Sequence, residues 1–251
     1  MIPKILHCCW FGKNPKPKLV RKCINSWKKF CSDYRIMEWT ENNYDIDLAP
    51  KYVRDAYNEK KWAFVADYVR LEMLVQYGGV YLDTDVELIG SLDLFLNNKG
   101  FLGSEDGMHV STAVMGCEKD NLLIWQFKEQ YNSLSFHNSD GSLNMTTNVV
   151  LMTDFFKKKG YKPQNVFQMI DEFSIYPSEY FYPLSIDDAI LRKTNKTVAI
   201  HWFAGSWVNN EKKKKRKKRQ LKNRLKPKIV ALIGKERFEY LKKVFRYRNN
   251  D

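Results

Sequence analysis

Two aspartates separated by one residue are the clearest sign of chemistry in this sequence. Asp83 and Asp85 stand in the stretch GGVYLDTDVE, directly after the short apolar run 80–82. Because that run predicts a buried strand, the carboxylates would lie at its end and could both face one cation. Carboxylate oxygens suit Mg²⁺ and Mn²⁺, and ligand sites of open α/β sheets lie beyond the carboxyl ends of strands. A solvated acidic turn is the alternative that so short a motif leaves open.

The surrounding sequence alternates between strand and helix patterns. Strands are predicted over 2–10, 34–39, 80–83, 101–106, 112–117, 166–170, 173–184 and 197–207. Helices are predicted over 15–30, 62–77, 121–134 and 146–160. Gly78 and Gly79 would let the chain turn tightly between a helix and the strand that carries the acids. Such alternation predicts an α/β fold with a mostly parallel sheet flanked by helices.

Positive charge is concentrated at the C-terminal end. The 251-residue chain has a net charge of +13, and residues 211–251 alone hold 18 Lys and Arg against 4 Asp and Glu. We therefore expect a near-neutral globular domain over 1–210 and a basic amphipathic helical tail over 211–251. Leu221 and Leu225 suit a first basic helix that Pro227 would stop, with further helices after it.

The basic tail predicts a partner of opposite charge. Basic amphipathic helices are typical of binding to anionic membrane surfaces, which favours a peripheral position at the inner face of a membrane. Nucleic-acid binding is the less favoured alternative, because the charge sits in one appendage and no DNA- or RNA-binding motif accompanies it. A solvated, partly packed tail is the third possibility.

Other sequence features exclude several classes of protein. A hydrophobic fraction of 44% supports a packed core, and no apolar stretch approaches the ~20 residues that span a bilayer. The opening MIPKILHCCWFG is too short and broken for a secretory signal, so we expect a cytoplasmic protein. The cysteines form no CxxC pair, which favours buried reduced thiols over disulfides or a zinc ribbon. They are Cys8, Cys9, Cys23, Cys31 and Cys117.

Three stretches in order along the chain point to a known family. IPKILHCCWFG at 2–12, ADYVRLEMLVQYGGVYLDTDVE at 66–87 and HWFAGSW at 201–207 resemble the DxD-containing sugar-transferase family of capsular and mannosyl glycosyltransferases. That family is related to the catalytic domains of large clostridial glucosylating toxins. The resemblance spans residues 1 to about 207 and implies a GT-A fold. It also implies metal-dependent, retaining transfer of a sugar from a nucleotide donor.

The resemblance assigns roles to the acids and their neighbours. It implies that Asp67 and Arg70 hold the donor sugar, although two residues three apart on a helix could also form a plain surface ion pair. Asp83 and Asp85 would bind the metal, with Asp83 also near the donor. His201 follows an apolar strand, so we expect it at the same sheet edge, completing a Mn²⁺ or Mg²⁺ shell. A packing or surface histidine is the alternative. A nitrogen ligand favours Mn²⁺.

The remaining candidates concern the nucleotide. Trp10 ends the first predicted strand and is either a core residue or a flat platform for the base. Ser206 and Trp207 are expected to contact the diphosphate through hydroxyl and indole N–H donors. His7 lies inside the first strand and is expected to be structural.

The acceptor region is the least defined. Residues 105–195 match no motif, and acceptor-binding parts are expected there. Glu105 and Asp106 could approach the sugar or be solvated loop acids, and the second interpretation is favoured. Asn148 is a further candidate near the reacting centre. The donor is expected to be a UDP-sugar rather than GDP-mannose, and the acceptor a glycan or lipid-linked saccharide of surface or capsule polysaccharide synthesis. A protein acceptor remains the alternative.

Overall fold

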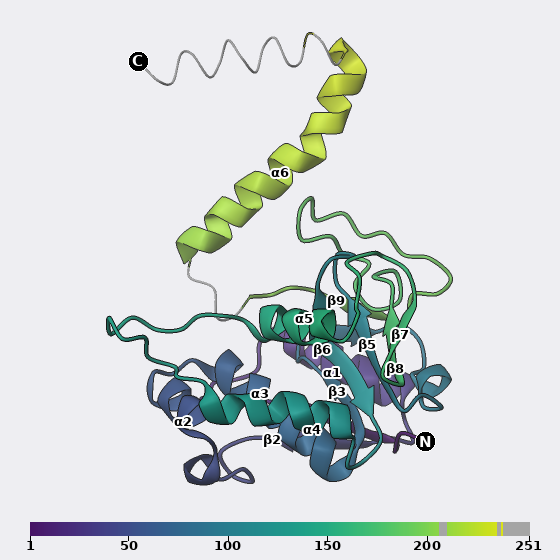
Figure 1. Ribbon diagram of the computed structural model, residues 1–251. Helices are drawn as coiled ribbons and strands as arrows, with labels where there is room; N and C mark the ends of the chain where they lie inside the picture. Colours follow the sequence, from purple (N-terminus) through teal and green to yellow (C-terminus); the bar gives the residue numbers. More distant parts are fainter. Residues whose placement is uncertain (206–209, 235–236, 238–251) are drawn as a thin grey trace. The chain divides into compact units, whose positions relative to one another are not determined.

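The computed structural model describes residues 1–205, 210–234 and 237, shown in Figure 1. Its residues group into two compact units. The first comprises Met1–Pro183 and Arg192–Trp207, and the second comprises Leu184–Leu191 and Val208–Asp251. Each unit is described by itself.

The first unit is built on a seven-stranded sheet in the order β2-β1-β3-β6-β5-β8-β7. Its strands are β1 Ile5–Cys9, β2 Arg35–Trp39, β3 Gly79–Leu82, β5 Gly100–Ser104, β6 Val110–Cys117, β7 Gln168–Ile170 and β8 Phe173–Tyr176. Strand β1 runs parallel to β2 and β3, and β5 runs parallel to β8. Strand β6 is antiparallel to both of its neighbours, and β7 is antiparallel to β8. The carboxyl ends of β1, β2 and β3 therefore meet at one edge.

Helices cover both faces of this sheet (Figure 1). They are α1 Lys18–Phe30, α2 Lys51–Asn58, α3 Trp62–Tyr77, α4 Leu122–Glu129 and α5 Asn148–Lys158. Short 3₁₀ turns lie at Ile46–Leu48, Asp93–Phe95 and Gln130–Ser133. Side chains of β3 alternate between the two faces, as a strand requires. The predicted α/β class with flanking helices is confirmed.

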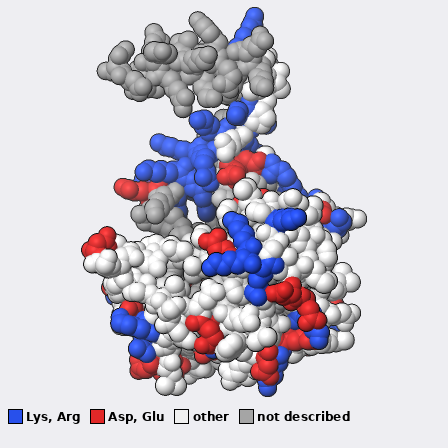
Figure 2. Space-filling view, in the orientation of Figure 1, with Lys and Arg blue, Asp and Glu red and all other residues white. Residues whose placement is uncertain are grey.

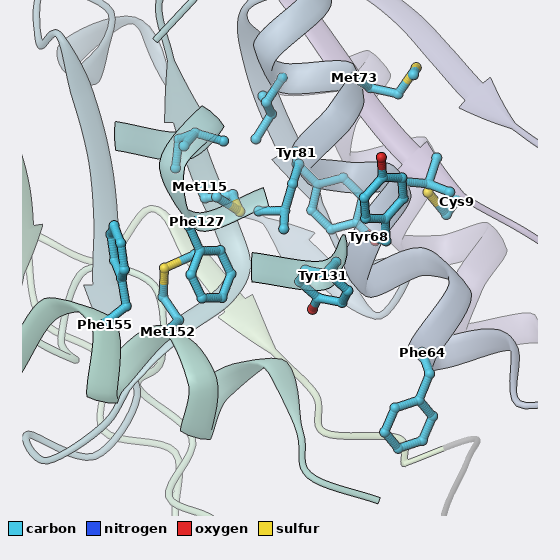
Figure 3. Close-up of a cluster of buried hydrophobic side chains, with 14 of the residues drawn as sticks. Cys9, Phe64, Tyr68, Met73, Tyr81, Met115, Phe127, Tyr131, Met152 and Phe155 are labelled. Carbon is cyan, nitrogen blue, oxygen red and sulfur yellow. The ribbon is translucent and has the colours of Figure 1, made fainter. Parts of the chain in front are cut away.

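Each face of the sheet has its own hydrophobic core. Helices α2 to α5 cover one face, where rings from Tyr68, Phe127 and Tyr131 pack with Tyr81 of β3 (Figure 3). On the other face, Trp27 of α1 is fully buried with other apolar residues of β1 and β3. Burial on both sides explains why the strand before the acids is an unbroken apolar run.

A small second sheet follows the two aspartates. Strand β4 (Val86–Leu88) pairs antiparallel with β9 (Ala199–His201). Helix α1 fixes β4 from one side, because the Trp27 indole N–H donates to the Val86 carbonyl at 2.7 Å and the Leu88 N–H donates to Ser26 Oγ at 2.9 Å. The segment that follows Asp85 is thus paired with β9, a strand near the C-terminal end of the first unit.

The described residues of the second unit include the long helix α6 (Asn210–Ile233). The expected stop at Pro227 is wrong, because the helix continues through this proline. The Asn223 carbonyl loses its usual donor there, but α6 is largely exposed and water can bond the freed oxygen. Segment 184–191 fastens to the helix, since Gln220 donates to the Ile186 carbonyl at 2.9 Å and Asn223 donates to the Asp187 carbonyl at 3.0 Å.

Other element boundaries differ from the sequence prediction. Helix α2 and strand β4 were not predicted. The strand expected over 173–184 ends at Tyr176, since Pro177 cannot donate to a ladder. The strand expected over 197–207 is paired only over Ala199–His201. These differences fall on short segments, where periodicity carries little information.

Two predictions about buried polar residues are confirmed. All five cysteines are free and buried. His7 is structural: its Nε2 lies 2.8 Å from the Gly78 carbonyl, its Nδ1 accepts from the Trp39 indole, and burial lowers its pKa to about 4.

Among the helices of the described residues, none is both long and apolar enough to cross a membrane.

Candidate functional site

The turn after β3 brings the two aspartates to the edge of the sheet. Gly78 and Gly79 enter the strand with φ of 64° and 103°, values that favour glycine. The Asp83 N–H donates to the Ala113 carbonyl of β6 at 2.8 Å, and the Val86 N–H donates back to the Asp83 carbonyl at 2.9 Å. The second contact closes a tight turn, which leaves both carboxylates projecting from one short bend.

Strand pairing brings a histidine to the same place. His201 is the register partner of Val86, the residue that follows Asp85. His201 Nε2 lies 3.3 Å from Asp85 Oδ1, and ligand atoms of Asp83, Asp85 and His201 all lie within 4.8 Å of one another. Their side chains are 26%, 15% and 12% exposed, so the cluster is largely screened yet still open to solvent.

The backbone of the C-terminal segment holds Asp85 in place. The Ala204 N–H donates to Asp85 Oδ2 at 2.7 Å, and the Trp202 N–H donates to the Asp85 carbonyl at 3.0 Å. Burial opposes the charge of Asp85, but the His201 imidazole and the hydrogen bond from the Ala204 N–H lower its pKa. Burial likewise opposes the charge of His201, but the carboxylates of Asp85, Asp83 and Glu105 raise its pKa.

Arg70 connects helix α3 to the first aspartate. Its Nη2 lies 2.8 Å from Asp67 Oδ1 and 3.3 Å from Asp83 Oδ1. Its Nη1 donates to the Thr112 carbonyl at 3.0 Å and to Thr112 Oγ1 at 2.9 Å, and the guanidinium lies 4.5 Å from the centre of the Tyr81 ring. Arg70 is buried and Asp67 is partly exposed, so the two form a largely screened pair rather than the alternative surface ion pair.

Burial sets the charge balance of this network. Arg70 is 4% exposed, and the carboxylates of Asp83 and Asp67 raise its pKa although burial works against the charge. Burial raises the pKa of Asp67 to about 6, opposed by Arg70 and by hydrogen bonds from Asn148. Asp67 is thus a carboxyl group that changes protonation close to neutral pH.

The donor set fits a hard or borderline divalent cation. Two carboxylates and one imidazole are the ligands that Mn²⁺ accepts, and Mg²⁺ would be held less well by the nitrogen. His201 Nδ1 is buried and has no hydrogen-bond partner among the described residues. A metal-bound imidazole usually donates its second N–H to a hydrogen-bond partner that fixes the ring orientation. His201 lacks such a partner among the described residues.

The remaining predicted residues lie in different situations. Trp10 follows β1 at the sheet edge, where its indole donates to the Asn14 carbonyl at 2.7 Å and Lys16 Nζ lies 5.7 Å from its ring centre. Its role as a base platform stays a prediction. Ser206 and Trp207 lie outside the described residues.

The two loop acids behave differently from each other. Glu105 is only partly exposed, and burial raises its pKa, which differs from the solvated loop acid that was expected. Asp106 is exposed and pairs with His109 at 2.7 Å, as a loop acid would.

Sequence reasoning missed several partners of the site. Tyr81 donates its hydroxyl to Asp83 Oδ1 at 3.0 Å, Thr112 binds Arg70, and the Ala204 N–H binds Asp85. Tyr81 stands inside the recognised motif and could have been considered. Thr112 and Ala204 act partly or wholly through main-chain groups, which carry no signal in the residue types.

A hollow in the first unit is separate from this cluster. It has a volume of about 750 Å³ and contains none of the predicted site residues. It is lined mainly by polar residues between Glu41 and Asn58.

Comparison with known proteins identifies the class. Residues 17–102, which contain Asp67, Arg70, Asp83 and Asp85, match the family described as "Glycosyltransferase sugar-binding region containing DXD motif". This segment is therefore similar to the sugar-binding region of glycosyltransferases that contain a DXD motif. The resemblance read from the sequence is confirmed over this segment, and the predicted α/β fold is confirmed by the sheet and its flanking helices.

Individual relatives agree with this class. The chain is 28% identical over 146 residues to inositol phosphoceramide mannosyltransferase 3 of Schizosaccharomyces pombe, covering 54% of this chain and 39% of that protein. It is 25% identical over 217 residues to an uncharacterized glycosyltransferase of Acanthamoeba polyphaga mimivirus, covering 78% and 82%. Among solved structures, the PaToxG glycosyltransferase aligns with a TM-score of 0.49 at 17% identity, covering 63% and 70%. The chain thus spans about two fifths of the first relative.

Proposed function

We propose that this protein is a metal-dependent, retaining glycosyltransferase that moves a hexose from a nucleotide-sugar to a saccharide or lipid-linked saccharide. One observation carries the proposal. Arg70 contacts both Asp67 and Asp83, so the pair on α3 and the cluster of Asp83, Asp85 and His201 form one continuous site. A sugar held by the pair and a diphosphate held at the cluster would be neighbours.

The cluster would hold a divalent ion through Asp83, Asp85 and His201, with Mn²⁺ favoured by the nitrogen ligand. When bound, such an ion supplies positive charge that stabilises the diphosphate leaving group. The other groups have their own tasks: Ala204 and Trp202 orient Asp85, and Tyr81 orients Asp83. A site whose dipoles are already fixed stabilises developing charge without reorganising.

The reaction proposed is a substitution at the anomeric carbon. The bond from that carbon to the phosphate oxygen breaks, and its electron pair leaves with the diphosphate. The acceptor hydroxyl oxygen bonds to the same carbon from the same face, and its proton passes to the departing phosphate. Asp67 and Arg70 orient the sugar hydroxyls, so that binding energy from the sugar positions the reacting carbon.

For the donor and the acceptor, we propose a chemical class in each case. A UDP-sugar was favoured from the sequence, whereas the name of the Schizosaccharomyces pombe relative supports a mannosyl donor such as GDP-mannose. The same name supports a lipid-linked acceptor. We keep synthesis of a surface glycan as the proposed setting, with the protein on the inner face of a membrane.

Helix α6 supplies an independent argument for a lipid surface. Its Lys and Arg side chains dominate the part of Figure 2 that it occupies. Leu221, Leu225, Ile229 and Leu232 are spaced four, four and three residues apart and are 59%, 42%, 41% and 86% exposed. This spacing forms one apolar stripe on a basic helix, the pattern that binds anionic membranes in the plane of the surface.

Vesicle sedimentation tests the role of α6. The full chain should sediment with phosphatidylserine-containing vesicles and not with phosphatidylcholine vesicles at the same salt concentration. The variant Leu225→Asp with Ile229→Asp should lose this binding, whereas Leu48→Asp, at a residue 84% exposed in the first unit, should keep it. Equal loss or equal retention in the two variants would refute α6 as the membrane contact.

A thermal-shift screen tests the catalytic proposal. Nucleotide-sugars that bind the folded protein raise its Tm by mass action, so a panel of UDP- and GDP-sugars with Mn²⁺ should single out one donor. That donor should also be hydrolysed slowly in the absence of acceptor. If no nucleotide-sugar raises the Tm or is turned over, with or without Mn²⁺, the proposed function is wrong.

A further inference from the structure

Asn148, the first residue of α5, is buried beside the donor-binding pair. It is 2% exposed, and its Nδ2 donates to the main-chain carbonyl of Asp67 at 3.0 Å. Asn148 therefore links the start of α5 to the backbone of Asp67 on another helix.

The start of α5 lacks the groups that usually complete a helix. Thr147 at the N-cap makes no side-chain capping bond, and the first turn contains no acidic residue. The first N–H groups of a helix need acceptors and favour a nearby negative charge. Asn148 lowers the pKa of the Asp67 carboxyl group, so the start of α5 favours the charged form of that group on α3.

Asn148 is poorly suited to a purely structural role. Its Oδ1 is buried and has no hydrogen-bond partner among the described residues. A buried polar atom without a partner costs stability, so an apolar side chain of similar size would serve the core at least as well. Thr153, on the same helix, is different: its Oγ1 accepts from the Val110 N–H at 2.9 Å and donates to the Val149 carbonyl at 2.6 Å.

We propose that Asn148 is a positioning residue that fixes Asp67 in the orientation needed to bind the donor sugar. The inference rests on the proposed function, because Asp67 is assigned to the sugar there. Asn148 acts through Asp67 and not on the diphosphate. Its loss should therefore weaken binding of the sugar part of the donor and leave binding of the nucleoside diphosphate unchanged.

The test compares Asn148→Ala, Asn148→Asp and Thr153→Val in the full chain. KM is measured for the nucleotide-sugar found in the screen, Kd for the matching nucleoside diphosphate with Mn²⁺, and Tm for each variant. Asn148→Ala should raise KM by about 10-fold or more, with Kd unchanged and Tm close to wild type. Asn148→Asp has the same shape but places a second carboxyl group against Asp67, so it should raise KM further.

Thr153→Val is the matched control for a buried polar residue of α5. It should lower Tm and leave both KM and Kd at wild-type values. If Asn148→Ala lowers Tm like Thr153→Val and leaves KM unchanged, or if no Asn148 variant folds, Asn148 is structural and the inference is wrong. Failure of the proposed function looks different, because wild-type protein would then show no nucleotide-sugar turnover at all.

Discussion

Val86 and His201 are register partners in the β4–β9 sheet, and this pairing sets the imidazole of His201 beside the carboxylate of Asp85. The acids come from the turn after a central strand, and the histidine comes from a strand near the end of the same unit. The proposed metal site therefore depends on two backbone segments being paired correctly, as well as on the three side chains.

The first prediction concerns the nitrogen ligand. His201→Gln should lower the affinity for Mn²⁺ about 10- to 100-fold, because it removes one of three proposed ligands. Binding of Mn²⁺ can be followed by electron paramagnetic resonance or calorimetry. The control is His137→Gln, whose ring lies beside Asp55 and Glu59 and outside the site. Equal Mn²⁺ affinity in the His201 and His137 variants would remove His201 from the metal shell.

The second prediction concerns the buried guanidinium. Arg70→Met should lower the free energy of unfolding by about 3–5 kcal/mol, because Asp67 and Asp83 are left without their shared cation. Donor binding should be lost as well. The double variant Arg70→Met with Asp67→Asn should recover part of the stability and none of the donor binding. If the double variant recovers no stability in denaturant unfolding, Arg70 stabilises the fold through its packing instead.

The third prediction concerns pH. The pKa of Asp67 is raised to about 6 by burial, so sugar binding that needs its carboxylate should weaken as the pH falls through 6. The effect on stability has the opposite sign, because the folded state holds this proton more tightly than the unfolded state. The stability contributed by protonated Asp67 is fully present below about pH 4 and is lost as the pH rises to about 6.

Asp67→Asn separates these effects from those of other groups. In this variant, the affinity for the donor, divided by the affinity for the nucleoside diphosphate alone, should no longer change near pH 6. It should also remove a stability change of about 1–3 kcal/mol between pH 4 and pH 7. An unaltered pH profile in the variant would assign the step to another group.

The fourth prediction concerns the glycine that starts β3. Gly79 has φ of 103°, and a Cβ there would lie 2.7 Å from the Ile5 carbonyl oxygen. Gly160 has φ of 102° with nothing within 4 Å of its Cβ position. Gly160→Ala should therefore cost about 1–2 kcal/mol from backbone strain, and Gly79→Ala clearly more because it adds a clash between strands. Equal unfolding free energies for the two variants would mean that β1 and β3 adjust without cost.

Sequence reasoning reached the motif and the class of fold because both depend on local patterns. The apolar run before Asp83, the helix that carries Asp67 and the alternation of elements are all visible within short windows. The partners of Arg70 are not, since Thr112 meets it through a carbonyl as well as a hydroxyl from a distant strand. The same holds for the pairing of β4 with β9.

The C-terminal helix shows a case in which a local sequence rule gave a wrong prediction. Pro227 predicts a stop from local rules alone, yet α6 continues past it. A proline costs a hydrogen bond and a steric adjustment, and a long exposed helix can tolerate both when water satisfies the freed carbonyl. Local rules give the cost of such a residue, and the surroundings decide whether the helix ends.

The central claim is that Asp85 helps to hold a divalent ion on which sugar transfer depends. The most direct measurement is turnover of the donor found by screening, for wild type and Asp85→Asn, with Mn²⁺ added and after treatment with a chelator. Wild-type turnover should vanish on chelation and return with Mn²⁺. In Asp85→Asn, both kcat and the turnover restored by Mn²⁺ should be at least about 10²-fold lower than in wild type. Turnover that survives both the chelator and Asp85→Asn would contradict the account.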